Sequence, residues 1–100
     1  MEARREAARR MSGYAIRFTK HAEDDAVCLD AAVLFRIHTA IETKLAVDPE
    51  RFGKPLRHAL RGLRALRVGD WRIIFKIEPN NIIVVLSVRH RGKGYGDFGV

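Results

Sequence analysis

Five basic residues near the end of the chain have side chains suited to chemistry on a phosphate group: Arg67, Arg72, Lys76, Arg89 and Arg91. Arginine stays charged at every accessible pH and presents a planar fork of donors that matches phosphate oxygens. Breaking a phosphodiester bond builds negative charge around the phosphorus atom, and fixed cations stabilise that charge. These residue types therefore favour a nucleic acid as the target, provided that the fold brings them together.

The overall charge favours the same kind of target. The 100 residues include 19 Lys and Arg against 12 Asp and Glu, which gives a formal net charge of +7. Such a surplus favours a polyanionic partner, either a nucleic acid or an acidic protein. A single cysteine, Cys28, excludes an internal disulfide, and its apolar neighbours predict a core position. Because the histidines lack metal-ligand spacing and the chain lacks a Gly-rich phosphate loop, we expect neither metal nor cofactor.

Length and hydropathy predict one small domain away from membranes. No apolar run approaches the roughly 20 residues that cross a bilayer, and the charged N-terminus lacks the apolar stretch of a secretory signal. We therefore expect a cytoplasmic protein. Residues 1–12 are predicted to be an exposed N-terminal extension, residues 13–95 the domain and residues 96–100 a flexible tail. Whether the native start is Met1 or Met11 stays open.

Hydrophobic periodicity predicts the elements that must position the arginines. A strand is expected at residues 14–18, a helix capped by Thr19 up to about residue 29, and a second helix at about 31–47 that Asp48-Pro49 ends. A loop at 50–55 is followed by strands at about 63–68, 71–77 and 82–89, with tight turns between them. The predicted fold class is α+β: an N-terminal strand, a helical hairpin and a three-stranded antiparallel meander in one sheet, with the helices on one face.

Strand alternation then predicts which way the side chains point. Trp71, Ile73, Phe75 and Ile77 are expected to face the helices, and Arg72 and Lys76 the opposite side. In the last strand, which is apolar on both faces and so is predicted to be central, the same rule turns His90 toward the helices. It places the following residues on the arginine face: Ile83, Val85, Ser87, Arg89 and Arg91, with Arg67 joining them from the strand at about 63–68.

Arginines on neighbouring strands repel one another unless an anion lies among them. The predicted cluster is therefore poorly explained by folding alone. The alternative is a solvated sheet face that Asp70 and Glu78, the acids nearby in sequence, neutralise.

From about residue 14 to residue 95, the chain resembles the RelE/ParE toxin superfamily. The motifs that carry the resemblance are GDWRIIF at residues 69–75 and SVRHR at residues 87–91. The segments at residues 14–18, 48–49 and 60–70 are also similar to that family. The resemblance implies a toxin that a cognate antitoxin protein neutralises. RelE-like members cleave mRNA on the ribosome, and ParE-like members inhibit DNA gyrase without the nuclease residues.

Site residues follow from the resemblance, position by position. Arg72 matches the family's transition-state arginine, Arg91 a second catalytic arginine, Arg67 a basic residue of the site and Tyr95 a C-terminal tyrosine. The implied reaction is a metal-independent RNA cleavage in which the 2′-OH attacks the neighbouring phosphate. The chain departs from the pattern at Ala65, where RelE carries a second lysine. It also departs at the short link 92–94, which leaves the placing of Tyr95 open.

The proton carriers of such a reaction are less clear from the sequence. Histidine is a residue type suited to acid–base work near neutral pH, but His90 is also interpreted as a structural or RNA-contacting histidine. Tyr95 is interpreted as a proton carrier or as a platform on which a base stacks. The remaining basic residues are predicted to bind RNA phosphates rather than react; they are Lys54, Arg57, Arg61, Arg64, Lys76 and Arg89.

Three functions are compatible with the sequence. The first is a ribosome-dependent mRNA endoribonuclease, with mRNA, the ribosome and an antitoxin as partners. The second is a ParE-like, non-enzymatic inhibitor of DNA gyrase. The third is an inactive toxin-fold protein that only binds its partner. Arg72, Arg91 and Tyr95 together favour the first, because a gyrase inhibitor would not need that set.

Overall fold

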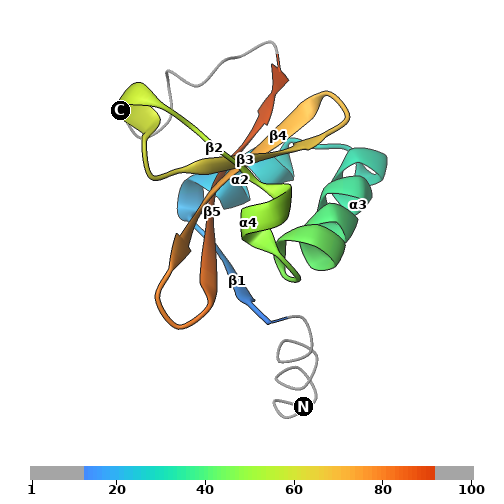
Figure 1. Ribbon diagram of the computed structural model, residues 1–100. Coiled ribbons are helices and arrows are strands. Elements are labelled where there is room, and N and C mark those ends of the chain that lie inside the picture. Colours follow the sequence, from blue (N-terminus) through green and yellow to red (C-terminus); the bar gives the residue numbers. More distant parts are fainter. Residues whose placement is uncertain (1–12, 92–100) are drawn as a thin grey trace.

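The computed structural model describes residues 13–91, and a five-stranded sheet forms the centre of this region (Figure 1). The strand order is β1-β5-β4-β3-β2, with β1 parallel to β5 and the other neighbours antiparallel. The strands are β1 (Ala15–Phe18), β2 (Lys54–Pro55), β3 (Arg64–Val68), β4 (Trp71–Glu78) and β5 (Ile82–His90). The predicted α+β fold is confirmed, and the last strand is central. The predicted extension at residues 1–12 and tail at 96–100 lie outside the described residues.

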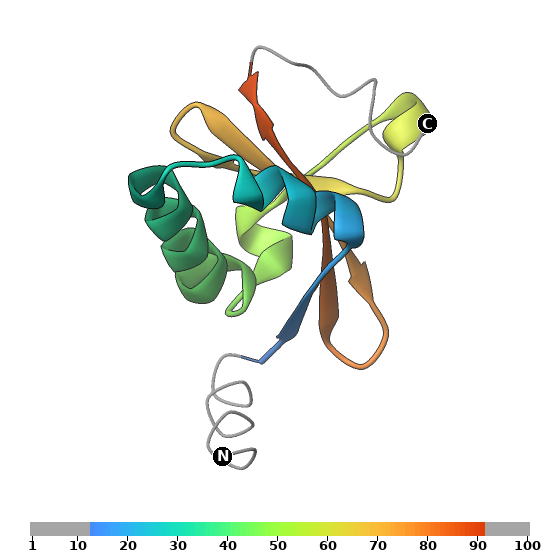
Figure 2. The same cartoon turned by 180° about the vertical axis from the view of Figure 1, so that it is seen from behind.

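Two helices follow β1, and each begins at a side-chain cap. The Thr19 hydroxyl accepts a hydrogen bond from the Ala22 N–H at the start of α2 (Lys20–Val27), as predicted. The Asp30 carboxylate likewise accepts a hydrogen bond from the Val33 N–H at the start of α3 (Ala31–Ala40). In Figure 2, α2 lies across the strands and α3 lies beside them. The two caps satisfy backbone N–H groups that the first turn of a helix leaves without partners.

The segment from residue 41 to residue 55 differs from the prediction. The α-helix ends at Ala40 and continues as a π-helical turn, η1 (Ile41–Leu45). Asp48-Pro49 does not end this helix but starts another, α4 (Pro49–Phe52), because the Asp48 carboxylate accepts from the Arg51 N–H and proline suits the first helical turn. The predicted loop at 50–55 therefore holds α4 and β2. A 3-10 turn, η2 (His58–Leu60), leads into β3.

The helices and the sheet enclose one apolar core. Ala22, Ile37, Ile41 and Leu45 pack against buried residues of β3, β4 and β5. Gly53 is required for this packing, since a Cβ there would overlap the ring of Phe75. Cys28, predicted to be a core residue, is exposed instead, because it follows the last residue of α2 and caps its C-terminal end.

A bulge in β5 changes which residues face the core. Ile74 pairs with Ser87 and Phe75 with Val85, so that Leu86 has no partner on β4. The prediction that Ile83 and Val85 lie on the arginine face was wrong: both are fully buried in the core. The prediction assumed that side chains alternate without interruption along β5. The bulge inserts Leu86 as an extra residue, so the residues before it face the opposite side from the one predicted. Beyond Leu86 the alternation resumes, with Val88 in the core and Arg89 on the opposite face.

Candidate nucleic-acid interface

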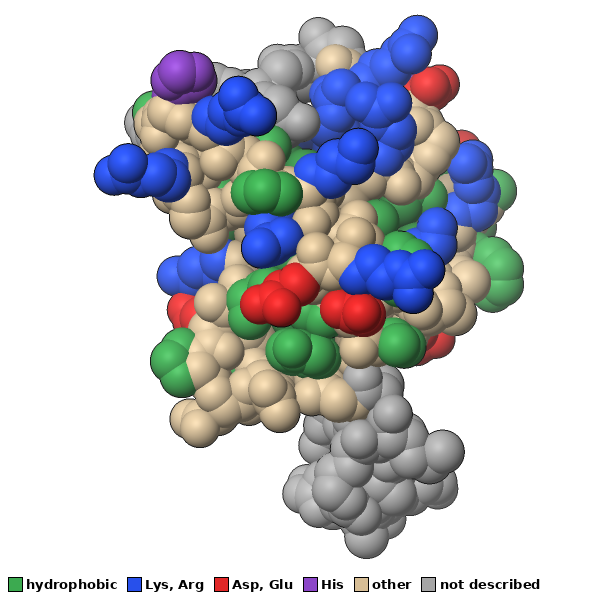
Figure 3. Space-filling view, viewed as in Figure 1, with side chains coloured by type: hydrophobic (Ala, Val, Ile, Leu, Met, Phe, Trp, Pro, Cys, Tyr) green, Lys and Arg blue, Asp and Glu red, His purple; other side chains and the backbone are tan. Residues whose placement is uncertain are grey.

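Three arginines lie side by side across the middle of the sheet, and we call them the arginine row: Arg67, Arg72 and Arg89. Arg67 on β3 pairs with Arg72 on β4, which pairs with Arg89 on β5. Partners in a sheet project from the same face, on strands about 4.8 Å apart. In Figure 3, Lys and Arg side chains gather where Figure 1 shows the end of β5 and the β3–β4 hairpin. The row thus concentrates positive charge on the face opposite the core.

The row combines an exposed end with a buried one. Arg67 is exposed and Arg72 half-buried, whereas Arg89 is only 8% exposed. Arg67 and Arg72 are therefore the members of the row that a phosphate group can contact from solvent. Arg89 adds a buried positive charge next to Arg72.

Arg91 is tied to this row through the β3–β4 hairpin. Its N–H donates to the Asp70 carbonyl at 2.7 Å, and its Nε lies 3.7 Å from the Asp70 carboxylate. The Arg91 carbonyl accepts a 3.4 Å hydrogen bond from Arg72 Nη1. Gly69 makes the tight turn possible with a φ of 61°, and a Cβ there would overlap the Arg36 guanidinium. The hairpin thus brings Arg72 and Arg91 together, although they are 19 residues apart in sequence.

His90 lies on the other face of the sheet. It pairs in register with Trp71, and the two rings meet edge to face with centroids 5.1 Å apart. Since Trp71 packs against the core, this geometry favours the structural interpretation of His90 over the catalytic one. Tyr95, the other predicted proton carrier, lies outside the described residues.

The predicted RNA-binding residues divide into two groups. Arg57 and Arg61 flank η2 and are exposed, and Lys54 is exposed on β2. Arg64, by contrast, donates to the Gly53 carbonyl at 2.8 Å and so holds the end of α4 in place. Lys76 lies 3.0 Å from the Glu78 carboxylate, four residues along β4 from Arg72.

A hollow of about 480 Å³ opens beside the arginine row. Four basic side chains and two apolar ones form its walls: Lys44, Lys54, Arg67, Arg72, Phe52 and Leu56. Ala65 and Leu66 also line it. Lys44, Phe52 and Leu56 were not predicted to belong to a site. Phe52 lies in the segment 50–55 that was expected to be a plain loop, and Lys44 lies in the region expected to be the second helix. The run Phe52-Gly53-Lys54, an aromatic residue and a cation around a glycine, was the available signal.

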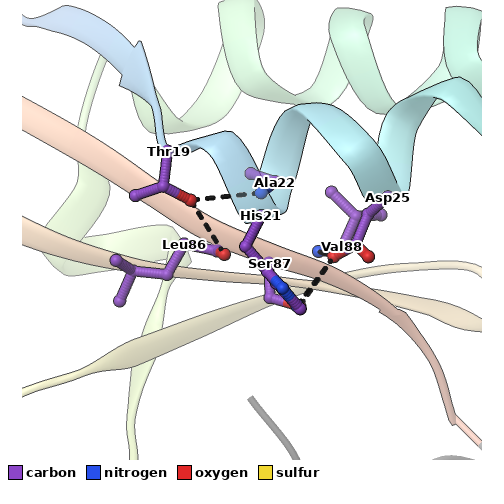
Figure 4. Close-up of polar contacts among 7 residues, drawn as sticks. All are labelled: Thr19, His21, Ala22, Asp25, Leu86, Ser87 and Val88. Carbon is purple, nitrogen blue, oxygen red and sulfur yellow. Dashed lines mark hydrogen bonds and ion pairs between the residues drawn. The ribbon is translucent and has the colours of Figure 1, made fainter. Parts of the chain in front are cut away.

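Where α2 meets β5, His21, Asp25 and Ser87 gather in a group that has the composition of a hydrolase triad (Figure 4). In a hydrolase triad the histidine lies between the serine and the aspartate, whereas here Asp25 lies between Ser87 and His21. Its Oδ2 accepts from Ser87 Oγ and from the Val88 N–H, both at 2.9 Å, and His21 Nε2 lies 3.6 Å away. A nucleophilic serine must contact the histidine and be accessible, whereas Ser87 is fully buried. This group therefore fastens α2 to β5 beyond the end of β1.

No group of three or more His, Cys, Asp or Glu side chains within residues 13–91 could hold a metal ion. No helix in the same region is long and apolar enough to cross a membrane.

Comparison with known proteins identifies relatives over most of the chain. Residues 15–95 match the family described as the ParE toxin of the type II toxin–antitoxin system parDE. Toxin RelG of Mycobacterium tuberculosis is 34% identical over 83 residues, which cover 82% of this chain and 95% of RelG. Toxin RelE of the same organism is 35% identical over 49 residues, about half of each chain.

Solved structures of toxin–antitoxin complexes are also similar to this chain. A chain of the RelBE2 toxin–antitoxin complex of M. tuberculosis is similar with a TM-score of 0.75 and 33% identity, covering 83% of this chain and 97% of that one. The RelB–RelE complex of Methanococcus jannaschii, at 21% identity and a TM-score of 0.63 over 82% of this chain and 98% of that one, shares the fold. The chain therefore belongs to the RelE/ParE superfamily and is a toxin of a type II toxin–antitoxin system.

Proposed function

We propose that this toxin is an endoribonuclease that cleaves mRNA on the ribosome through attack by the substrate's own 2′-OH. The observation that carries the proposal is the arginine row, joined to Arg91 by the Arg72 hydrogen bond. A flat face with several guanidinium groups suits a phosphate that gains negative charge in the transition state. A toxin that acted only by binding a protein would not need cations in this arrangement.

In the proposed reaction, the 2′-oxygen forms a bond to phosphorus as its proton leaves, and the bond from phosphorus to the 5′-oxygen breaks. Arg72 and Arg91 stabilise the charge on the phosphorane, Arg67 holds the flanking backbone, and the buried Arg89 adds positive charge beside Arg72. The leaving 5′-oxygen takes up a proton. Since His90 faces away from the row, the proton transfers fall to other groups. Tyr95 and groups of the ribosome are the candidates, and the ribosome would also orient the mRNA.

The proposed partners follow from the same surface and from the relatives. Several related toxins were solved in complexes with antitoxins. We propose that a cognate antitoxin neutralises this toxin as well and covers its basic face with acidic side chains. The remaining basic residues of this face, Lys54, Arg57, Arg61 and Lys76, would bind phosphates of mRNA or rRNA in the active toxin.

Inhibition of DNA gyrase is the second candidate, because the family that matches residues 15–95 is described as the ParE toxin. A ParE-like toxin needs no free 2′-OH and no phosphate-binding arginines. Removing a 2′-OH from the mRNA should therefore affect the ribonuclease function and leave gyrase inhibition unchanged.

A transcript with a single 2′-deoxynucleotide separates these functions. A translating extract receives the purified toxin and a reporter mRNA, and primer extension maps the cuts. Replacing the nucleotide 5′ of a cut by its 2′-deoxy form should abolish that cut and spare the others, because the nucleophile is missing. The Arg72→Ala toxin should cut roughly 10²- to 10³-fold more slowly at every site, as expected for the loss of one transition-state donor.

The charge-matched control is Arg17→Ala, which removes one exposed arginine from β1 and should cut like the wild type. Cuts that persist at the deoxy position would contradict 2′-OH attack. A toxin that makes no cuts but blocks supercoiling by purified gyrase would support the second function.

A further inference from the structure

We infer that the hollow beside the arginine row receives one nucleobase of a single-stranded RNA, and that Ala65 determines whether the base fits. This inference rests on the proposed function, because the RNA backbone must lie along the row. It adds a recognition site for a nucleotide next to the one whose phosphate Arg72 would hold.

The first step is the place of the hollow. Arg67 and Arg72 belong both to the arginine row and to the lining of the hollow. Lys54 and Ala65 are paired on the neighbouring strands β2 and β3. Ala65 lies two residues before Arg67 on the same face of β3, a distance of about 7 Å along the strand. This step is comparable with the distance between neighbouring nucleotides in an extended strand, so an RNA on the row would reach the hollow.

The second step is the chemistry of the lining. Lys44, Lys54, Arg67 and Arg72 supply four cations, and none of the described residues that line the hollow is acidic. Phe52 and Leu56 supply apolar surface, with the Arg51 guanidinium 5.3 Å and Lys44 Nζ 6.0 Å from the centre of the Phe52 ring. A nucleotide combines a flat apolar base with an anionic phosphate, and sites for single strands combine aromatic surfaces with cations. The lining suits these two parts of one ligand.

The third step is the role of Ala65. Its methyl group lies between the Lys54 and Ile74 positions of the adjacent strands and lines the hollow. Any longer side chain at residue 65 would project from the same face into this space. A small residue at this position therefore keeps this part of the hollow open. Ala65→Leu should narrow the hollow beside Arg67, whereas Ala65→Ser should leave it open.

Binding of a non-cleavable oligonucleotide tests the inference apart from catalysis. The probe is a fluorescent 2′-O-methyl RNA hexamer, together with six variants that each lack one base but keep every phosphate. Fluorescence anisotropy measures their affinity for the purified toxin. For the wild type, removing one particular base should weaken binding about tenfold, within the range known for a base packed against an aromatic side chain.

The variants then connect that base to the hollow. Ala65→Leu should bind the complete hexamer about tenfold more weakly than the wild type, and removing the same base should cost it nothing further. Ala65→Ser should bind like the wild type. Ala32→Leu adds the same side chain at an exposed position of α3 and should have no effect. Equal thermal unfolding midpoints for the three variants would show that each is folded.

The outcomes separate the inference from the proposed function. If Ala65→Leu binds as tightly as the wild type while Arg72→Ala binds more weakly, the hollow is not a base site and the arginine row still binds RNA. If no single base matters to the wild type, the inference fails in the same way. If Arg72→Ala also binds without loss, or if the wild type does not bind the hexamer, the inference fails. The proposed function is then judged separately, by cleavage of the reporter mRNA in the translating extract.

Discussion

At the scale of single residues, neighbouring positions of one strand have opposite roles. Arg89 and His90 follow one another on β5, yet Arg89 lies in the arginine row and His90 contacts Trp71 on the other face. Residue type alone would favour His90 as the acid or base, since histidine titrates near neutral pH. The register favours a structural role for His90 instead, because a catalytic group must reach the proton that it moves.

Replacing His90 by Gln tests this division. The Trp71 contact should be weakened, and the free energy of unfolding should fall by about 0.5–1.5 kcal/mol, the range for an edge-to-face ring pair. The rate of mRNA cleavage in a translating extract, measured well below the unfolding midpoint, should stay within about twofold of the wild-type rate. A large loss of cleavage with an unchanged unfolding midpoint would show instead that His90 takes part in the reaction.

At the scale of elements, the contact of α2 with β5 replaces the strand pairing that β1 leaves unfinished. β1 pairs with β5 only up to Val85. Beyond it, the Thr19 N–H donates to the Val85 carbonyl, Thr19 Oγ1 donates to the Leu86 carbonyl, and Asp25 accepts from Ser87 and Val88. Polar groups at this buried edge are thus satisfied by a helix, and the end of β5 that carries Arg89 is held in place.

Asp25→Ala should therefore destabilise the toxin clearly. The Val88 N–H and the buried Ser87 hydroxyl would lose their acceptor, at a cost of about 1–3 kcal/mol. Urea unfolding followed by circular dichroism measures this loss. Asp24→Ala is the matched control, because it removes an exposed carboxylate whose ion pair is with the exposed Lys20. This variant should change the free energy of unfolding by less than about 0.5 kcal/mol. Equal stabilities of the two variants would contradict the role assigned to Asp25.

The elements also show what the sequence could and could not predict. The longer helices and strands, the Thr19 cap and the Gly69-Asp70 turn follow from local patterns, which depend on neighbouring residues only. The short elements η1, α4 and β2 were not predicted. The bulge at Leu86 does not, because it depends on how β5 fits between β1 and β4. The arginine row was predictable, since Arg67 and Arg72 flank the turn symmetrically. The hollow was not, because Lys44, Phe52 and Arg67 come from three separate elements.

At the scale of the whole molecule, the net charge of +7 and the arginine row both make the protein attractive to polyanions. A positive surface accelerates the encounter with RNA, and the contacts to phosphates make the affinity fall as salt rises. Charge alone gives affinity without chemistry. The proposed reaction depends on where the charges lie, and Arg72 and Arg91 are the two that the β3–β4 hairpin brings together.

The most direct test of the proposed function compares the toxin with the Arg72→Ala, Arg91→Ala double variant in growing bacteria. Both are induced, and primer extension on a reporter transcript follows with and without translation. We expect growth arrest and translation-dependent cuts from the wild type, and neither from the double variant at equal protein level. Growth arrest without cuts, equally strong in the double variant, would contradict the ribonuclease function and the role of the two arginines.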